Sequence, residues 1–147
     1  MSNFTTKFLL AVAVLISGGI TAANAQVPEN TALRVSIPNS FVLDNRNYPA
    51  GDYTISRTVG TTNPSSLLVL RGPGGIAVIF DTIPTEIANA APHTQLVFDK
   101  VGDLYFLSKI FVKGDTIGNE IPQTKSERRM IAASKKKEVQ IVDVTGF

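Results

Sequence analysis

The side chains that could carry out chemistry in this chain are few. The 147 residues include one histidine, His93, and no cysteine, which excludes a Cys/His catalytic pair and a ligand cluster with zinc spacing. A serine triad would need His93 from a loop rich in alanine, and no Gly-x-Ser-x-Gly elbow presents a nucleophile. We therefore expect His93 to be a solvated loop residue. The sequence predicts no catalytic residue, no metal site and no cofactor.

Acidic residues offer the remaining route to catalysis. Asp99 lies near Asp103 in the sequence, and Asp115 lies near Glu120. Two neighbouring carboxylates can bind calcium or cleave a glycosidic bond as an acid/base pair. Neither set has the dense alternating oxygen ligands of a calcium loop, and surface turns commonly carry such acids. A carboxylate-based hydrolase stays open as one alternative, and a protein that is not an enzyme is the main expectation.

The first 25 residues have the form of a secretory signal peptide. Lys7 precedes the apolar run Phe8 to Ile16, and the segment closes on small residues at Ala23 and Ala25. A bilayer span needs about 20 apolar residues, and this run is much shorter. We expect cleavage near Ala25 and a periplasmic or secreted bacterial protein with no transmembrane span after cleavage. Without cysteine it cannot form disulfides, so burial and backbone hydrogen bonds must stabilise it.

The remaining residues 26–147 are enough for a single domain with one core. Charge is unevenly spread in this part of the chain, because one short segment near the C-terminus is strongly basic. That segment is the candidate for contact with an anionic surface. Its basic residues are Lys125, Arg128, Arg129, Lys135, Lys136 and Lys137. No nucleic-acid motif accompanies them, and an exported protein does not meet nucleic acid, so we expect none as a partner.

Short runs of branched and aromatic residues, separated by Gly, Pro, Asn and Asp, predict strands through most of the chain. In the segment Tyr53 to Arg57 the alternation predicts that Tyr53 and Ile55 face a core while Thr54 and Ser56 face outward. The segment Leu104 to Leu107 is apolar on both faces, which predicts a central strand with its second face covered. The expected strands are Leu33 to Ile37, Phe41 to Leu43, Tyr53 to Thr58, Leu67 to Arg71, Ile76 to Asp81, Thr94 to Asp99, Leu104 to Val112 and Glu138 to Val144.

Short turns connect several of these strands. Gly72 to Gly75 and Asp99 to Asp103 have hairpin composition. Pro49 to Gly51 predicts a turn in which Gly51 takes the left-handed conformation. Short links favour antiparallel neighbours, and no βαβ rhythm appears. The predicted fold class is therefore all-β, a mainly antiparallel sandwich or barrel.

One C-terminal α-helix interrupts this pattern. Thr124-Lys125-Ser126-Glu127 has the form of a capping box, which predicts a helix over about 125–136. Its apolar stripe is thin, with Met130, Ile131 and Ala133 as members. We expect the helix to lie on the sheet surface with its cationic side in water.

Several sequence patterns together resemble a family of small exported β-rich proteins abundant in Acidobacteria. They are Ile37-Pro38 with Phe41-Val42, the run Tyr48 to Ile55, Leu96 to Phe98, Gly102 to Leu107, Gly118 to Pro122, and Ser126 to Arg128. The resemblance covers most of the chain after the leader. It implies a secreted β-rich domain and no nameable activity.

Three classes of function follow from these observations. The first is a non-enzymatic binding or structural module of the cell envelope, whose partner would be an envelope polymer or protein. The second is a β-barrel carrier of a small apolar ligand, since barrels of about eight strands are either filled or hollow. The third is the carboxylate-based hydrolase, with Asp99, Asp103, Asp115 and Glu120 as its candidates.

Overall fold

The computed structural model describes residues 32–58, 67–134 and 136–144. Within these ranges the chain forms two β-sheets and one α-helix, so the predicted fold class, all-β with one C-terminal helix, is confirmed. The helix, α1, spans Lys125–Ser134 and ends slightly before the predicted boundary. The expected signal peptide lies outside the described residues. Among the described helices, none is long and apolar enough to cross a membrane.

The first sheet has four antiparallel strands in the order β1-β4-β5-β6. Their bounds are Leu33–Ile37 for β1, Gly51–Arg57 for β4, Leu67–Arg71 for β5 and Ala77–Asp81 for β6. Tyr53 and Ile55 of β4 are buried, and Thr54 and Ser56 alternate with them on the other face, as the sequence predicts. The register pairs Val35 with Tyr53, so both place their side chains in the core.

The second sheet follows the order β11-β8-β9-β10-β7, and the short strands β2 and β3 attach beside β9. The bounds are Phe41–Leu43 for β2, Arg46–Tyr48 for β3, Ile83–Glu86 for β7, Gln95–Val101 for β8, Leu104–Phe111 for β9, Ile117–Glu120 for β10 and Glu138–Asp143 for β11. The β2–β9 contact is parallel, through the pair Val42 and Phe106, whereas the other pairings are antiparallel. As predicted, β9 is a central strand.

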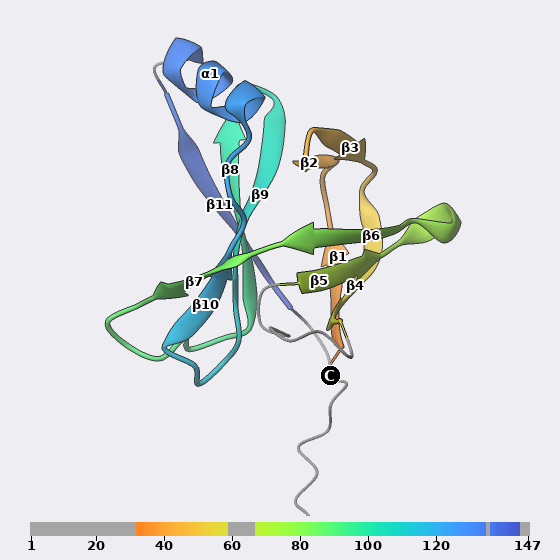
Figure 1. Ribbon diagram of the computed structural model, residues 1–147, viewed down its shortest axis with the longest axis vertical. Helices are drawn as coiled ribbons and strands as arrows, with labels where there is room; N and C mark the ends of the chain where they lie inside the picture. Colours follow the sequence, from red (N-terminus) through yellow and green to blue (C-terminus); the bar gives the residue numbers. More distant parts are fainter. Residues whose placement is uncertain (1–31, 59–66, 135, 145–147) are drawn as a thin grey trace, which may run out of the picture.

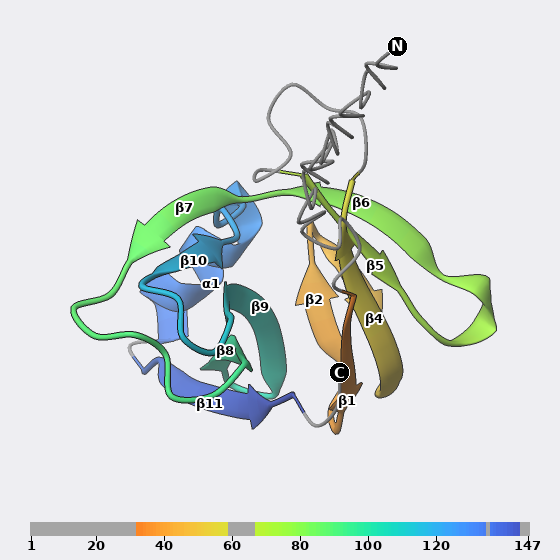
Figure 2. The same ribbon diagram turned by 90° about the horizontal axis from the view of Figure 1, so that it is seen from below.

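One long strand links the two sheets. β6 and β7 are separated by Thr82 alone, so the chain leaves the first sheet and enters the second without a turn (Figure 1). Thr82 is buried, and its hydroxyl donates a hydrogen bond to Asn119 Oδ1 at 3.2 Å on β10. The result is a sandwich-like fold joined along one side, while on the other side β1 and β11 are edge strands among the residues that the structure describes (Figure 2).

The structure contains three strands that the sequence did not predict: β3, β7 and β10. β3 is short and polar, but Asp44 and Asn45 before it both have positive φ, which is typical of a two-residue hairpin turn. β7 contains Pro84, which cannot donate to a ladder and is accepted here because β7 is an edge strand. β10 contains a glycine and polar residues, and it forms because β9 and β7 pair on its two sides.

The turn before β4 differs in detail from the prediction. Gly51 has φ of 151°, positive but far from the left-handed helical value, and it begins β4 directly. The Tyr53 hydroxyl donates a hydrogen bond to the Pro49 carbonyl at 2.6 Å, which ties the strand to its own turn. A Cβ on Gly72 would lie 2.2 Å from the Tyr53 ring, so this position needs glycine for close approach.

Aromatic rings hold the two sheets together around Phe41, which has no exposed surface. Its ring centroid lies 5.5 Å from Tyr48, 5.2 Å from Tyr53 and 5.8 Å from Phe98. Tyr53 belongs to the first sheet and Phe98 to the second. Edge-to-face packing of this kind adds to the free energy gained by burying the rings. Phe41 therefore bridges the two sheets.

We expect Phe41→Ala to lower the free energy of unfolding by about 3–5 kcal/mol, because it leaves a cavity among three rings. Ile79→Ala is the matched control, since Ile79 is 59% exposed on β6. Its effect should stay within about 0.5 kcal/mol. Urea unfolding followed by circular dichroism measures both. Equal effects of the two substitutions would contradict the central role given to Phe41.

Candidate functional site

The α-helix has two distinct faces. Glu127, Met130 and Ile131 are spaced i, i+3, i+4 and lie on the side that is buried or half-buried. Lys125, Arg128 and Arg129, with the same spacing, form the opposite, exposed side, called here the cationic face. The prediction of a thin apolar stripe holds for Met130 and Ile131. It is wrong for Ala133, which is exposed: Ala133 lies about 240° around the helix from Glu127, away from the face that docks on the sheet.

The predicted capping box is formed. The backbone N–H of Glu127 donates to Thr124 Oγ1 at 3.2 Å, and the Thr124 hydroxyl donates to Asn45 Oδ1 at 2.8 Å. The second bond anchors the start of the helix to the β2–β3 hairpin. A backbone hydrogen bond from Thr124 to the Glu127 carboxylate completes the reciprocal pair and lowers the Glu127 pKa. Local sequence chemistry thus places the helix start, and Asn45 directs it onto the sheet.

Two carboxylates from different elements come together beneath the helix. Asp99 on β8 is 3% exposed and Glu127 on α1 is 7% exposed. Lys137 Nζ lies 2.6 Å from Asp99 Oδ2, an ion pair whose angles do not meet those of a hydrogen bond. Burial has the largest effect and raises the pKa of Glu127. The backbone hydrogen bond from Thr124 lowers this pKa, the charge of Asp99 raises it by less, and the charge of Lys137 lowers it; the net pKa is raised. The group acts as a polar clamp between α1 and the second sheet.

The carboxylates considered in the sequence for hydrolysis do not gather. Asp99 forms an ion pair with Lys137, whereas Asp103 lies exposed in the β8–β9 turn. Asp115 is an exposed turn residue, and Glu120 at the end of β10 pairs with Lys109 at 3.5 Å. The structure instead brings Asp99 to Glu127. Sequence reasoning assigned Glu127 to the capping box but missed its burial, because burial depends on where the helix docks.

The basic segment splits into groups with different surroundings. Lys136 Nζ lies 2.6 Å from Glu138 Oε1, and Lys137 pairs with Asp99. Lys125, Arg128 and Arg129 on the cationic face have no acidic partner among the described residues. Lys135 lies outside the described residues. Thus part of the predicted anionic contact surface is already neutralised, and the cationic face keeps its charge available.

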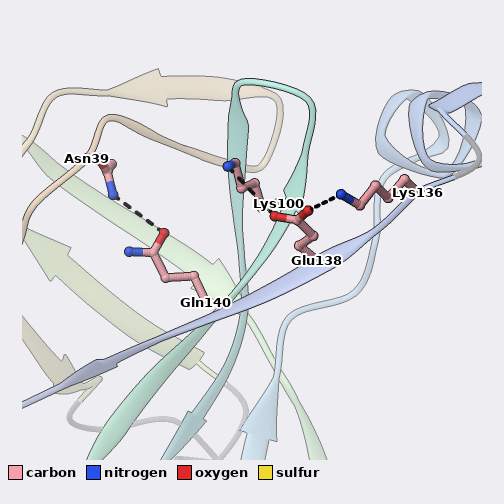
Figure 3. Close-up of polar contacts among 5 residues, drawn as sticks. All are labelled: Asn39, Lys100, Lys136, Glu138 and Gln140. Atoms are coloured by element: carbon pink, nitrogen blue, oxygen red, sulfur yellow. Dashed lines mark hydrogen bonds and ion pairs between the residues drawn. The ribbon is translucent and has the colours of Figure 1, made fainter.

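A shallow depression lies at the open side of the fold, where the β1–β2 connection approaches β11. We call it the seam depression; its about 160 Å³ of space between atoms includes open solvent and leaves no room for a water molecule inside, so a ligand would lie across it. Its lining residues are Ile37, Pro38, Asn39, Phe98, Tyr105, Gln140 and Val142. The floor is apolar and aromatic, and the polar groups at its rim are two amides. The Asn39 amide donates to Gln140 Oε1 at 3.5 Å across the depression (Figure 3).

Charged groups continue the same side of β11 beyond Gln140. Glu138 accepts from Lys136 and also lies 3.8 Å from Lys100 Nζ (Figure 3). The hydrogen bond from Lys136 lowers the Glu138 pKa, and Lys100 acts in the same direction. Lys100 Nζ is 5.7 Å from the centroid of the Tyr105 ring, a cation–π contact. These contacts hold Tyr105 at the edge of the seam depression.

The chemistry of the seam depression suits a neutral ligand with hydroxyl groups. After their mutual bond, the Asn39 oxygen can still accept and the Gln140 NH2 group can still donate. A hydroxyl both donates and accepts, so it can satisfy both amides. Pro38, Tyr105 and Val142 keep exposed surface beside the amides and can contact the C–H surface of such a ligand, whereas Ile37 and Phe98 are buried below them.

No sequence pattern indicated this site. Asn39 and Gln140 are 101 residues apart, and neither stands in a motif. The alternation of the last strand predicted that Val142 lies in a strand. Its neighbours across the seam depend on tertiary packing and could not be predicted. His93 is an exposed loop residue, as expected. In the described ranges, no group of three or more His, Cys, Asp or Glu residues could hold a metal ion.

Comparison of this chain with protein-family models, with curated proteins and with solved structures finds no match. The resemblance to the Acidobacteria family therefore stays a prediction. The site has to be interpreted from its own geometry.

The polar clamp predicts a defined pH dependence. The pKa of Glu127 is higher in the folded than in the unfolded state, so its protonated form favours folding. Its contribution is present below the unfolded value of 4.5 and is lost as pH rises through the raised folded pKa. Glu127→Gln removes this titration. We expect the stability of the variant relative to the wild type to increase as pH rises from 4 toward neutrality.

Urea unfolding at several pH values measures this difference. Glu86→Gln is the control, because Glu86 is exposed on β7, and its difference from the wild type should be nearly independent of pH. The opposite result would contradict this prediction. If the wild type became more stable relative to Glu127→Gln as pH rises, the charged form of the buried carboxylate would be the one that favours folding.

Proposed function

We propose that this chain is a non-enzymatic binding module of the bacterial cell envelope, and that its seam depression binds a hydroxyl-rich polysaccharide chain. The observation that carries the proposal is the pair of facing amides, Asn39 and Gln140, above an apolar floor that includes Tyr105. A shallow and open site suits a segment of a long polymer better than an enclosed small molecule. The leader pattern supports export of the module to the compartment where such polymers occur.

The arrangement of the acids supports a binding role over hydrolysis. Retaining and inverting glycosidases need two carboxylates that flank a bound sugar. Here Asp99 and Glu127 lie beneath α1 and are occupied by Lys137 and the Thr124 backbone. Neither residue lines the seam depression. The depression therefore has groups for recognition without an adjacent acid pair.

An apolar carrier receives less support. A carrier needs interior space between the sheets, and large side chains occupy the region around Phe41. Tyr53, Phe98 and Leu70 are also buried there. The seam depression reaches the surface and carries polar groups at its rim.

We expect Asn39→Ala and Gln140→Ala each to weaken binding of cello- or chito-oligosaccharides about tenfold, since each loses about 1.4 kcal/mol of hydrogen bonding. Isothermal titration of the purified protein measures the dissociation constants. Asn47→Ala is the matched amide control, because Asn47 is exposed on β3 and is not among the lining residues. The proposal fails if neither oligosaccharide binds at millimolar concentration, or if Asn47→Ala weakens binding as much.

A second candidate function is contact with an anionic polymer through the cationic face. Lys125, Arg128 and Arg129 project from α1 with no acidic partner among the described residues. Buried Glu127 and the Thr124 cap fix the opposite face of α1 against the rest of the fold, so the three basic side chains face solvent. Clustered cations raise the local potential and attract polyanions, and salt screens this attraction.

We expect the triple change Lys125→Glu, Arg128→Glu and Arg129→Glu to abolish salt-sensitive adsorption to a polygalacturonate resin. The measurement is the salt concentration needed for elution. The control is reversal of Arg34, Arg57 and Arg71, which are equally exposed but lie on the first sheet. The same loss in both triple variants would assign adsorption to net charge and overturn a role for the cationic face.

A further inference from the structure

β11 has an unpaired edge that is unusually open to pairing. It bonds to β8 along Glu138–Asp143, and among the described residues no other strand lies along its far side (Figure 2). Proteins usually protect such edges with proline, central charges or a covering element. The edge strand β7 has Pro84, for example. β11 has no proline, and its charged residues Glu138 and Asp143 stand at its ends.

The outward face of β11 is also apolar. Val139 is 61% exposed and Ile141 is 55% exposed. Both are β-branched residues, which favour strands. Lys137 and Asp143 continue this face, because alternate residues point to the same side. Along one face the order is therefore Lys137, whose ammonium already pairs with Asp99 of the same chain, then two apolar residues, then Asp143.

We propose that β11 is a self-complementary interface that pairs antiparallel with β11 of a second copy of this chain, in a register centred on Gln140. In that register Val139 of each copy faces Ile141 of the other, and Lys137 of each copy faces Asp143 of the other. A two-fold axis through Gln140 relates the copies, so the contact closes and does not propagate. Facing apolar pairs and opposite-charge pairs both stabilise an antiparallel ladder.

The matching of apolar residues on the outward face selects this register among its neighbours. In an antiparallel ladder, two directly opposite residues either both form backbone hydrogen bonds with each other or both do not. The outward faces of the two sheets must also lie on the same side of the joined sheet. Shifts that keep these conditions move the axis by one residue. An axis at Ile141 places Val139 opposite Asp143, and an axis at Val139 places Lys137 opposite Ile141. Only the axis at Gln140 gives two apolar pairs on the outward face and sets no apolar residue of that face opposite a charged one; on the other face it sets Glu138 opposite Val142.

Such a dimer would join the second sheets of two copies into one continuous sheet. Their seam depressions would then lie on the same side of that sheet, since Gln140 and Val142 point away from the outer face in both copies. A polymer could engage both depressions, which raises its overall affinity. The pairing itself does not depend on the proposed ligand.

Cysteine cross-linking tests the register directly, because the natural chain has no cysteine. The two variants are Val139→Cys and Ile141→Cys, purified separately with different tags and then oxidised alone or mixed. In the proposed register the unlike cysteines face each other at about 5 Å between Cα atoms. Like cysteines stand about 8 Å apart on the diagonal, too far for a disulfide. We expect a disulfide-linked species in the mixture and little in either variant alone.

Random collision is controlled by Ile79→Cys, which is equally exposed on β6. It should cross-link no more in mixtures with Ile141→Cys than alone. Sedimentation equilibrium of the cysteine-free protein should show a dimer, and Ile141→Lys should give a monomer with unchanged circular dichroism. A monomeric wild type, or like cysteines that cross-link better than the unlike mixture, would overturn the proposal.

Discussion

Phe41 lies where the two sheets meet, and the packing of its ring against Tyr53 and Phe98 keeps them in one relative position. The strand that carries it, β2, is short, yet it pairs with both β3 and β9. Phe98 is also part of the seam depression. Because interiors are close-packed and transmit strain, a change at Phe41 should reach the site through Phe98. The chain has no cysteine, so this burial takes the place of a cross-link.

The helix is held by polar contacts more than by apolar burial. Glu127 is buried beside Asp99, and Lys137 compensates the charge of Asp99. Burying such groups costs free energy unless they are paired, so the clamp contributes more to the orientation of α1 than to stability. The orientation matters because it turns Lys125, Arg128 and Arg129 away from the sheet. The same contact that covers β8 therefore displays the cationic face.

The open side of the fold lies along β11, where the proposed polysaccharide site and the proposed dimer interface are both located. The continuous strand β6–β7 joins the sheets on one side. On the other side the β1–β2 connection reaches β11 through the Asn39–Gln140 hydrogen bond, and among the described residues no ladder joins β1 to β11. That incomplete closure leaves the seam depression on one face and an unpaired strand edge beside it. The proposed polysaccharide binding and the proposed self-association thus both depend on one structural feature.

Local patterns in the sequence were sufficient for the fold class and most strands. The bounds of Leu33–Ile37, Phe41–Leu43 and Leu67–Arg71 agree with prediction, because alternation and flanking turn residues act over a few positions. The Thr124 cap was predictable for the same reason. β7 and β10 were not, since their proline, glycine and polar residues form strands here through pairing with distant neighbours.

The sequence by itself determined that the chain is β-rich, has one capped C-terminal helix and lacks disulfides, because these properties depend on residue type and short-range order. Tertiary structure alone decided that Asp99 meets Glu127 and that Asn39 meets Gln140. Those pairs come from segments far apart in the chain. Their meeting depends on sheet order, register and helix docking, and no local pattern encodes these.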